Sequence, residues 1–267
     1  MKLLVAIVAL WYRLFDRKAV RASRDWLTRV QGKPPGFWGV YRHIRTFTQA
    51  TLDRVFLLSG KTRGLTFTRD GNHHLFAQAA SGRGAVLLGA HVGSFEAMRA
   101  SGDDEELRIN VLGYFENARM INALLEKLNP GRAENVIHLG NDPVGVMASV
   151  KERVDAGEFV ALLGDRTGLN ERTIRVPFFG EDAEFPTGPF LLASLLRCPV
   201  YLTFGLYQPP GHYALSCTPF AETLQLPRKD RDAALRDVVT RYAAQLEEIC
   251  RREPYNWFNF YDYWNKP

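Results

Sequence analysis

The sequence has few cysteines and no long apolar segment, and each of these shortages excludes a class of protein. Its three cysteines, Cys198, Cys217 and Cys250, are odd in number and far apart, and no CxxC pair or Cys/His cluster occurs. This spacing supports neither a disulfide framework nor a zinc site, so we expect no bound metal and a reducing compartment. The apolar run over residues 3–12 has ten residues, too few for a membrane-spanning helix, which needs about 20.

Positive charge is concentrated in the first 33 residues of the sequence. Eight lysines and arginines stand there against two aspartates, a net charge of +6, whereas the whole chain carries +5. Trp11 and Tyr12 close the apolar run, Arg13 follows where a signal peptide would have a small-x-small cleavage site, and a basic amphipathic stretch comes next. This order is typical of a helix lying in a membrane interface, although an ordinary helix with a solvated basic face fits the same pattern. We predict a peripheral membrane-surface segment over residues 1–33 and no binding of nucleic acid.

The remaining residues, 34–267, contain no low-complexity tract and no break in composition that would indicate a second domain. Short apolar runs alternate with helical patterns, which predicts an α/β domain with a largely parallel central sheet covered by helices on both faces. Strands are predicted over residues 65–68, 85–88, 107–115, 135–139, 159–163, 199–207 and 212–219. Helices are predicted over residues 41–58, 73–80, 118–128, 143–156, 189–196 and 231–252. Residues 101–106 are predicted to form an acidic connection, and the stretches 173–180 and 185–189, with their Pro and Gly residues, a defined loop.

The stretch from Gly84 to Ala100, GAVLLGAHVGSFEAMRA, is the centre of this predicted domain. A buried strand ends at Gly89, a turn bounded by that residue and Gly93 follows, and Ser94 is the expected N-cap of a helix. His91 is thereby predicted at the carboxyl end of a strand, where open α/β sheets tend to bind ligands.

His91 and Glu96 form an H-x4-E pattern whose chemistry depends on this local geometry. Residues five apart on one regular helix point roughly 140° away from each other. With His91 still in the turn and Glu96 in the first helical turn, the carboxylate can reach back to the imidazole. That is the arrangement of a general base oriented by an acid. The alternative is a histidine with a purely structural role near a strand end.

Four blocks together resemble the lysophospholipid acyltransferase superfamily, and within it the bacterial late acyltransferases of lipid A biosynthesis. They are GAHVGSFE from Gly89 to Glu96, LLGDRT from Leu162 to Thr167, VPFFG through FPTGP from Val176 to Pro189, and EPYNWFNFYDYW from Glu253 to Trp264. The last block also resembles a subgroup found beside aryl-polyene or polyketide-like pigment biosynthesis. The resemblance implies a fold like that of glycerol-phosphate acyltransferases.

The resemblance further implies acyl transfer from a thioester, on acyl carrier protein or coenzyme A, to a hydroxyl of a lipid or glycolipid. On this reading His91 is the general base, Glu96 orients it, and no covalent acyl-enzyme forms. Acyl carrier protein and a membrane lipid acceptor are the expected partners, and no cofactor is expected beyond the acyl donor. The expected location is the cytoplasmic face of the bacterial inner membrane, bound peripherally.

Six further residues are predicted to contact substrate: Gly93, Ser94, Asp165, Arg166, Thr187 and Gly188. Arg166 is suited to hold a phosphate or pantetheine group or to face developing negative charge, although a structural pair with Asp165 is an equal alternative. Thr187 and Gly188 match a block associated with acceptor binding in the superfamily.

Two other functions fit parts of the sequence. Ser94 beside His91 is a candidate nucleophile of a serine-type lipid hydrolase, but no G-x-S-x-G motif is present. A non-catalytic protein that only binds lipid or a carrier protein is the second alternative, and the presence of both His91 and Glu96 disfavours it.

Overall fold

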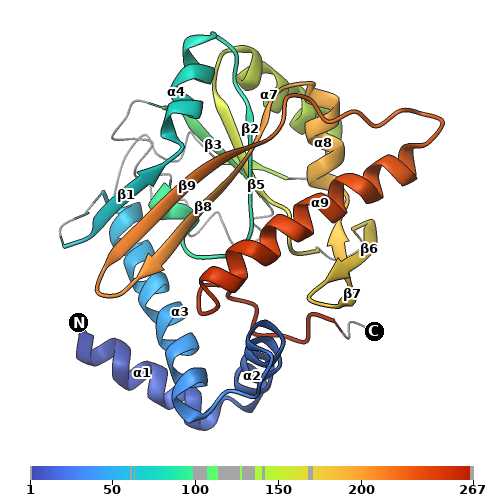
Figure 1. The fold of residues 1–267 in the computed structure, drawn as a ribbon. Coiled ribbons are helices and arrows are strands. Elements are labelled where there is room, and N and C mark those ends of the chain that lie inside the picture. Colours follow the sequence, from blue (N-terminus) through green and yellow to red (C-terminus); the bar gives the residue numbers. More distant parts are fainter. Residues whose placement is uncertain are drawn as a thin grey trace.

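The structure is a computed structural model that describes residues 2–60, 62, 64–98, 107–113, 127, 136–139, 142–167 and 171–264 (Figure 1). The predicted acidic connection over residues 101–106 lies outside the described residues, as does the predicted helix over residues 118–128 apart from residue 127.

A seven-stranded sheet forms the centre of the molecule, with strand order β1-β9-β8-β2-β5-β3-β4. Its strands are β1 (Thr66–Asp70), β2 (Val86–Gly89), β3 (Ile109–Gly113), β4 (Val136–His138), β5 (Phe159–Leu163), β8 (Val200–Gln208) and β9 (His212–Ala221). All neighbouring strands are parallel except β8 and β9, which form an antiparallel hairpin. The prediction of a largely parallel sheet is confirmed.

Helices cover both faces of this sheet (Figure 1). They include α4 (Asn72–Ala80), α7 (Pro143–Asp155), α8 (Gly188–Leu196) and α9 (Arg231–Arg252). Val86 and Leu88 of β2 pack in the core formed with α7, α8 and α9, whereas Leu87 packs on the other face with Leu75 of α4 and with Phe95. A strand buried on both faces is apolar at every position, which explains the continuous run in the sequence.

The predicted loop over residues 173–180 and 185–189 is wrong for most of its length. The structure has two antiparallel strands there, β6 (Thr173–Phe178) and β7 (Glu181–Pro186). Phe179 and Gly180 between them have φ of 52° and 84°, as the tight turn of a two-residue hairpin requires. The prolines in these strands suggested a loop, but a two-stranded ribbon has open edges on which a proline leaves no hydrogen bond unmade.

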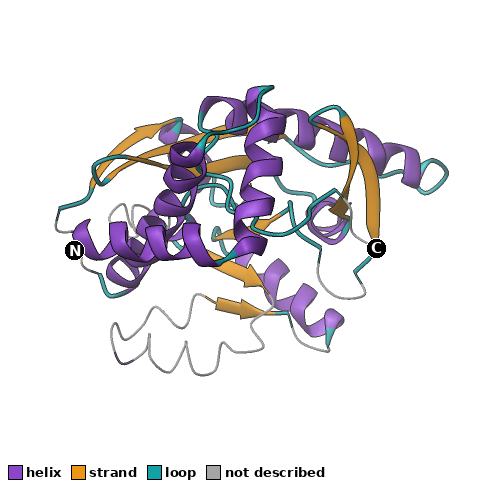
Figure 2. Cartoon of the chain, turned by 90° about the horizontal axis from the view of Figure 1, so that it is seen from below, coloured by secondary structure: helices purple, strands orange, loops and turns teal. Residues whose placement is uncertain are grey.

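Three helices, α1 (Lys2–Phe15), α2 (Arg17–Gln31) and α3 (Phe37–Leu58), lie together at one end of the molecule, which Figure 2 shows from below. Asp16 lies between α1 and α2 and caps α2, because its side chain accepts a hydrogen bond from Ala19 N. Gly32, in the left-handed conformation, ends α2. Among the described residues, no helix has both the length and the apolar character to cross a membrane.

Candidate active site

The carboxyl ends of β2 and β5 bring His91 and Asp165 together. The two strands are parallel neighbours, and Gly89 is in register with Leu163. His91 and Asp165 each follow two residues after this pair, so they emerge side by side at the ends of the two strands. The carbonyl oxygen of Gly89 accepts hydrogen bonds from Gly164 N at 3.0 Å and from the Tyr242 hydroxyl at 2.7 Å. The strand register, one backbone hydrogen bond and the Tyr242 hydroxyl therefore fix the strand ends from which His91 and Asp165 emerge.

The imidazole of His91 is held by the carboxylate of Asp165. Nδ1 of His91 lies 2.8 Å from Oδ1 of Asp165, and the same oxygen accepts a hydrogen bond from the backbone N–H of His91 at 3.0 Å. A carboxylate only accepts, so Nδ1 carries the proton of the neutral ring and Nε2 keeps its lone pair. The His91 side chain is 32% exposed, and within the described part of the chain Nε2 has no partner.

Asp165 is fully buried, and its second oxygen accepts a hydrogen bond from Nε1 of Trp257 at 3.1 Å. Burial pulls the pKa of Asp165 upward. The charge and hydrogen bonds of His91, together with the charge of Arg166, outweigh that effect and lower the pKa of Asp165 below its ordinary value. Asp165 is therefore ionised near neutral pH and is able to stabilise an imidazolium at His91.

Glu96 does not make the predicted contact with His91. Its Oε1 forms an ion pair with Nε of Arg54 at 2.7 Å, and its Oε2 accepts a hydrogen bond from the Ser94 hydroxyl at 3.4 Å. In the first turn of its helix the Glu96 carboxylate meets α3, whereas Nδ1 of His91 has a single proton and Asp165 accepts it. The structure thus corrects the sequence prediction, because the orienting carboxylate is Asp165.

Gly93 and Ser94 hold the turn after His91. Gly93 has a φ of 69°, and a Cβ there would lie 2.0 Å from the carbonyl oxygen of Gly205, so no other residue fits. Ser94 donates its N–H to the same Gly205 oxygen at 2.8 Å, and its buried hydroxyl accepts a hydrogen bond from Ala97 N at 3.2 Å. The predicted N-cap is confirmed. A substrate contact by Gly93 or Ser94 stays a prediction.

Arg166 reaches the C-terminal segment of the chain. Its Nε donates a hydrogen bond to Oδ1 of Asn259, and a terminal nitrogen donates one to the carbonyl of Phe258, both at 2.6 Å. The Asp165 carboxylate is occupied by His91 and Trp257. A hydrogen-bonded pair of Arg166 with Asp165, one of the two predicted alternatives, is therefore absent from the described structure, and Arg166 influences Asp165 through its charge.

Thr187 and Gly188 lie at the start of α8. Thr187 is buried, and its N–H and hydroxyl both donate to the carbonyl of Arg172 at 3.0 Å. A Cβ on Gly188 would lie 2.9 Å from a carboxylate oxygen of Glu171. These contacts fasten the α8 start to the chain before β6, and none of them involves His91. Acceptor binding by Thr187 and Gly188 stays a prediction.

The aromatic segment near the C-terminus forms the back wall of the site. Trp257 pairs with Val92 as an antiparallel bridge, and Phe258 N donates a hydrogen bond to the carbonyl of His91 at 3.0 Å. The Tyr263 hydroxyl donates a hydrogen bond to the carbonyl of Asp165 at 2.8 Å. Trp257 and Tyr263 are buried, so both are part of the core. These hydrogen bonds to His91 and Asp165 were not predicted from the sequence.

His43 of α3 connects this wall to the N-terminal helices. Its Nε2 lies 2.9 Å from the carbonyl oxygen of Trp257, and its Nδ1 lies 2.9 Å from the hydroxyl of Ser23 in α2. A carbonyl only accepts, so Nε2 carries the proton and Nδ1 accepts from Ser23. Burial lowers the pKa of His43 to about 4, although the Trp257 carbonyl partly opposes the shift.

His43 is expected to make folding stability depend on pH. In the unfolded chain the pKa of His43 is about 6.5. Below that pH the unfolded state therefore binds a proton, whereas the folded state binds it only near pH 4. Stability should therefore fall by up to about 3 kcal/mol as pH drops from 6.5 to 4. Urea unfolding of the wild type and His43→Gln across this range measures the effect. Parallel pH profiles of unfolding free energy in the two proteins would contradict it.

A buried carboxylate behind an accessible imidazole, at the carboxyl edge of a parallel sheet, is an arrangement suited to taking a proton from a substrate. The chain belongs to the family of bacterial lipid A biosynthesis acyltransferases, whose model matches residues 48–266. This match includes the whole sheet and the candidate site, while α1 and α2 precede it. A comparison with curated proteins gave no match. The protein is therefore an O-acyltransferase that acts on lipids, from a membrane-associated family.

Proposed function

We propose that this enzyme transfers an acyl chain from a thioester, on acyl carrier protein or coenzyme A, to a hydroxyl of a lipid or glycolipid. The observation that carries the proposal is the pairing of His91 Nδ1 with the buried Asp165 at 2.8 Å. It leaves Nε2 unprotonated on a side chain that solvent reaches. A hydroxyl is a poor nucleophile until a base of this kind takes its proton.

The proposed reaction uses His91 twice. Nε2 takes the hydroxyl proton as the oxygen attacks the thioester carbonyl, which gives a tetrahedral intermediate and an imidazolium. The intermediate then expels the thiolate, which takes the proton from Nε2 and leaves as a thiol, while the new ester remains on the acceptor. Asp165 stays ionised and stabilises the imidazolium. A positioned base contributes roughly 10²- to 10⁴-fold in rate, and holding donor and acceptor together supplies much of the remainder.

The competing serine-hydrolase function is disfavoured by the surroundings of Ser94. Ser94 is 3% exposed, and its hydroxyl caps Ala97 N and contacts Glu96. A nucleophile needs its oxygen beside the base and open to the substrate, whereas Ser94 is buried and the hydrogen bonds of its hydroxyl are with Ala97 and Glu96.

We propose that α1 lies on the membrane surface. Val5 and Ala9 of α1 are buried in the molecule, while eight large apolar side chains of the helix are exposed: Leu3, Leu4, Ile7, Leu10, Trp11, Tyr12, Leu14 and Phe15. A helix with one apolar face left in solvent suits an interfacial position. Acyl carrier protein and coenzyme A thioesters are cytoplasmic, so the proposed location is the cytoplasmic face of the inner membrane.

Mass spectrometry of a reaction mixture tests the proposed reaction. The purified protein is incubated with a panel of acyl carrier protein and coenzyme A thioesters, polyene chains included, and with a bacterial membrane lipid extract. We expect a new lipid ester and free thiol in equal amounts, with one donor preferred. Thiol release accompanied by free fatty acid and no new ester would instead identify a hydrolase.

A further inference from the structure

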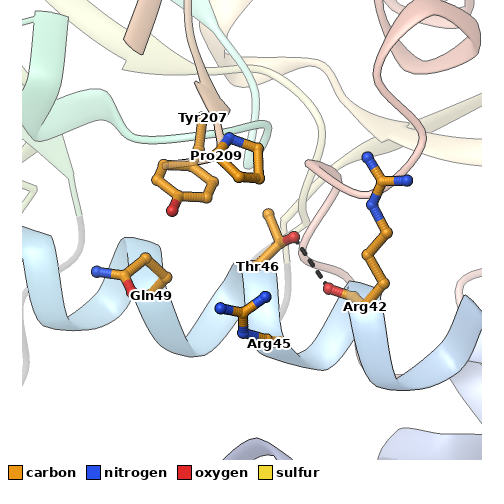
Figure 3. A pocket seen from close by; sticks show the side chains of 6 residues that line it. All are labelled: Arg42, Arg45, Thr46, Gln49, Tyr207 and Pro209. Carbon is orange, nitrogen blue, oxygen red and sulfur yellow. Dashed lines mark hydrogen bonds between the residues drawn. The ribbon is translucent and has the colours of Figure 1, made fainter. Parts of the chain in front are cut away.

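A pocket outside the site just described lies between α3 and the end of β8. Arg42, Arg45, Thr46 and Gln49 line it from α3, and Tyr207 and Pro209 line it from the opposite side (Figure 3). The Thr46 hydroxyl donates its hydrogen bond to the carbonyl of Arg42 in its own helix. The Gln49 amide donates a hydrogen bond to Asp53, and the two guanidinium groups are the charged groups of the lining.

The two arginines carry positive charge that the described structure leaves unbalanced. Arg42 lies over the ring of Tyr255, with its central carbon 4.3 Å from the ring centroid, and among the described residues neither Arg42 nor Arg45 forms an ion pair. Asp53, on the same helix, is buried, and its carboxylate already accepts hydrogen bonds from Gln49 and Tyr213. A guanidinium group is suited to bind the oxygens of a phosphate.

Helix α3, which lines the pocket, begins at the apolar end of the molecule. Trp38 is 72% exposed, and its spacing of four and seven residues from Arg42 and Arg45 puts all three on one face of the helix. Arg13 at the end of α1 lies over the ring of Phe37, 4.3 Å from its centroid. The start of α3 and its exposed Trp38 therefore lie beside the apolar α1.

The spacing along α3 matches the layers of a membrane surface. At a rise of 1.5 Å per residue, Arg42 and Arg45 lie about 6 Å and about 10 Å beyond Trp38 along the helix. Trp side chains favour the boundary between hydrocarbon and headgroups, and each headgroup layer is roughly 5–8 Å thick. With α3 along the membrane normal and Trp38 at this boundary, the guanidinium groups are at the level of lipid phosphates.

We propose that the pocket of Arg42 and Arg45 binds the phosphate of an anionic lipid headgroup. The inference rests on the proposed membrane position of α1 and adds a specific lipid contact to it. Its test measures binding to vesicles and no turnover, so failure of this inference and failure of the proposed reaction are distinguishable.

Vesicle binding by a double variant tests the proposal. Arg42→Gln/Arg45→Gln should weaken binding to vesicles of phosphatidylcholine mixed with phosphatidylglycerol about 30-fold, and should leave binding to pure phosphatidylcholine vesicles unchanged. The matched control is Arg228→Gln/Lys229→Gln, which removes the same charge from exposed positions in the loop before α9. The control should weaken binding less than threefold.

Two results would overturn the proposal. Equal losses in the double variant and the control would mean that net charge alone attracts the protein to the membrane. Calorimetry with glycerol 3-phosphate provides the second arm. If glycerol 3-phosphate binds the wild type but not the double variant, while both bind phosphatidylglycerol vesicles equally, the pocket takes a soluble phosphate and the lipid assignment is wrong.

Discussion

The Asp165→Asn variant is expected to lose about 10³- to 10⁴-fold in kcat. An asparagine has nearly the same shape, but its amide can donate a hydrogen bond to Nδ1 of His91. The imidazole proton then moves to Nε2, the atom that must accept the proton of the acceptor hydroxyl. The imidazolium also loses its ionised neighbour. Steady-state release of thiol from the acyl donor, at saturating lipid acceptor, measures kcat.

Because Asp165 is fully buried, its role is to position His91 rather than to touch substrate. The KM values for donor and acceptor should therefore change little, and circular dichroism should show an intact fold. A folded Asp165→Asn protein with kcat within tenfold of the wild type would remove this residue from the mechanism.

The His91→Ala variant is expected to lose about 10²- to 10⁴-fold in kcat, the contribution of a positioned base. The backbone N–H of His91 still donates to Asp165 after the substitution, so the turn itself should persist. Single-turnover formation of the lipid ester, followed by mass spectrometry, measures the loss.

Added imidazole is the control for this variant. The truncated side chain leaves space near a partly exposed position, and free imidazole should restore part of the His91→Ala rate in proportion to its unprotonated fraction. An unimpaired His91→Ala enzyme would rule out His91 as the base. If the variant instead has a higher KM and an unchanged kcat, His91 contributes to substrate binding.

Much of the fold could be predicted because its signals are local. The apolar runs over residues 85–88 and 159–163 fall within one residue of β2 and β5, and the helix predicted over residues 231–252 has the bounds of α9. The same signals placed His91 at a strand end. The β6–β7 hairpin was missed because its buried aromatics lie among prolines and glycines, which locally indicate a loop.

The partner of His91 could not be predicted from spacing along the chain. Glu96 is five residues away, whereas Asp165 is 74 residues away and reaches His91 only because β2 and β5 are adjacent and in register. Strand order is a tertiary property, and a strand pattern does not state its neighbour. The hydrogen bonds of Trp257 and Tyr263 to Asp165 depend equally on how the C-terminal segment folds back.

The central claim is that the carboxylate serving His91 belongs to Asp165. The most direct measurement compares kcat of Asp165→Asn with that of Glu96→Gln in the same acyl-transfer assay. We predict a loss of about 10³-fold or more for Asp165→Asn, and of no more than about tenfold for Glu96→Gln, which loses its ion pair with Arg54. A Glu96→Gln enzyme as inactive as His91→Ala, beside an active Asp165→Asn enzyme, would contradict the claim.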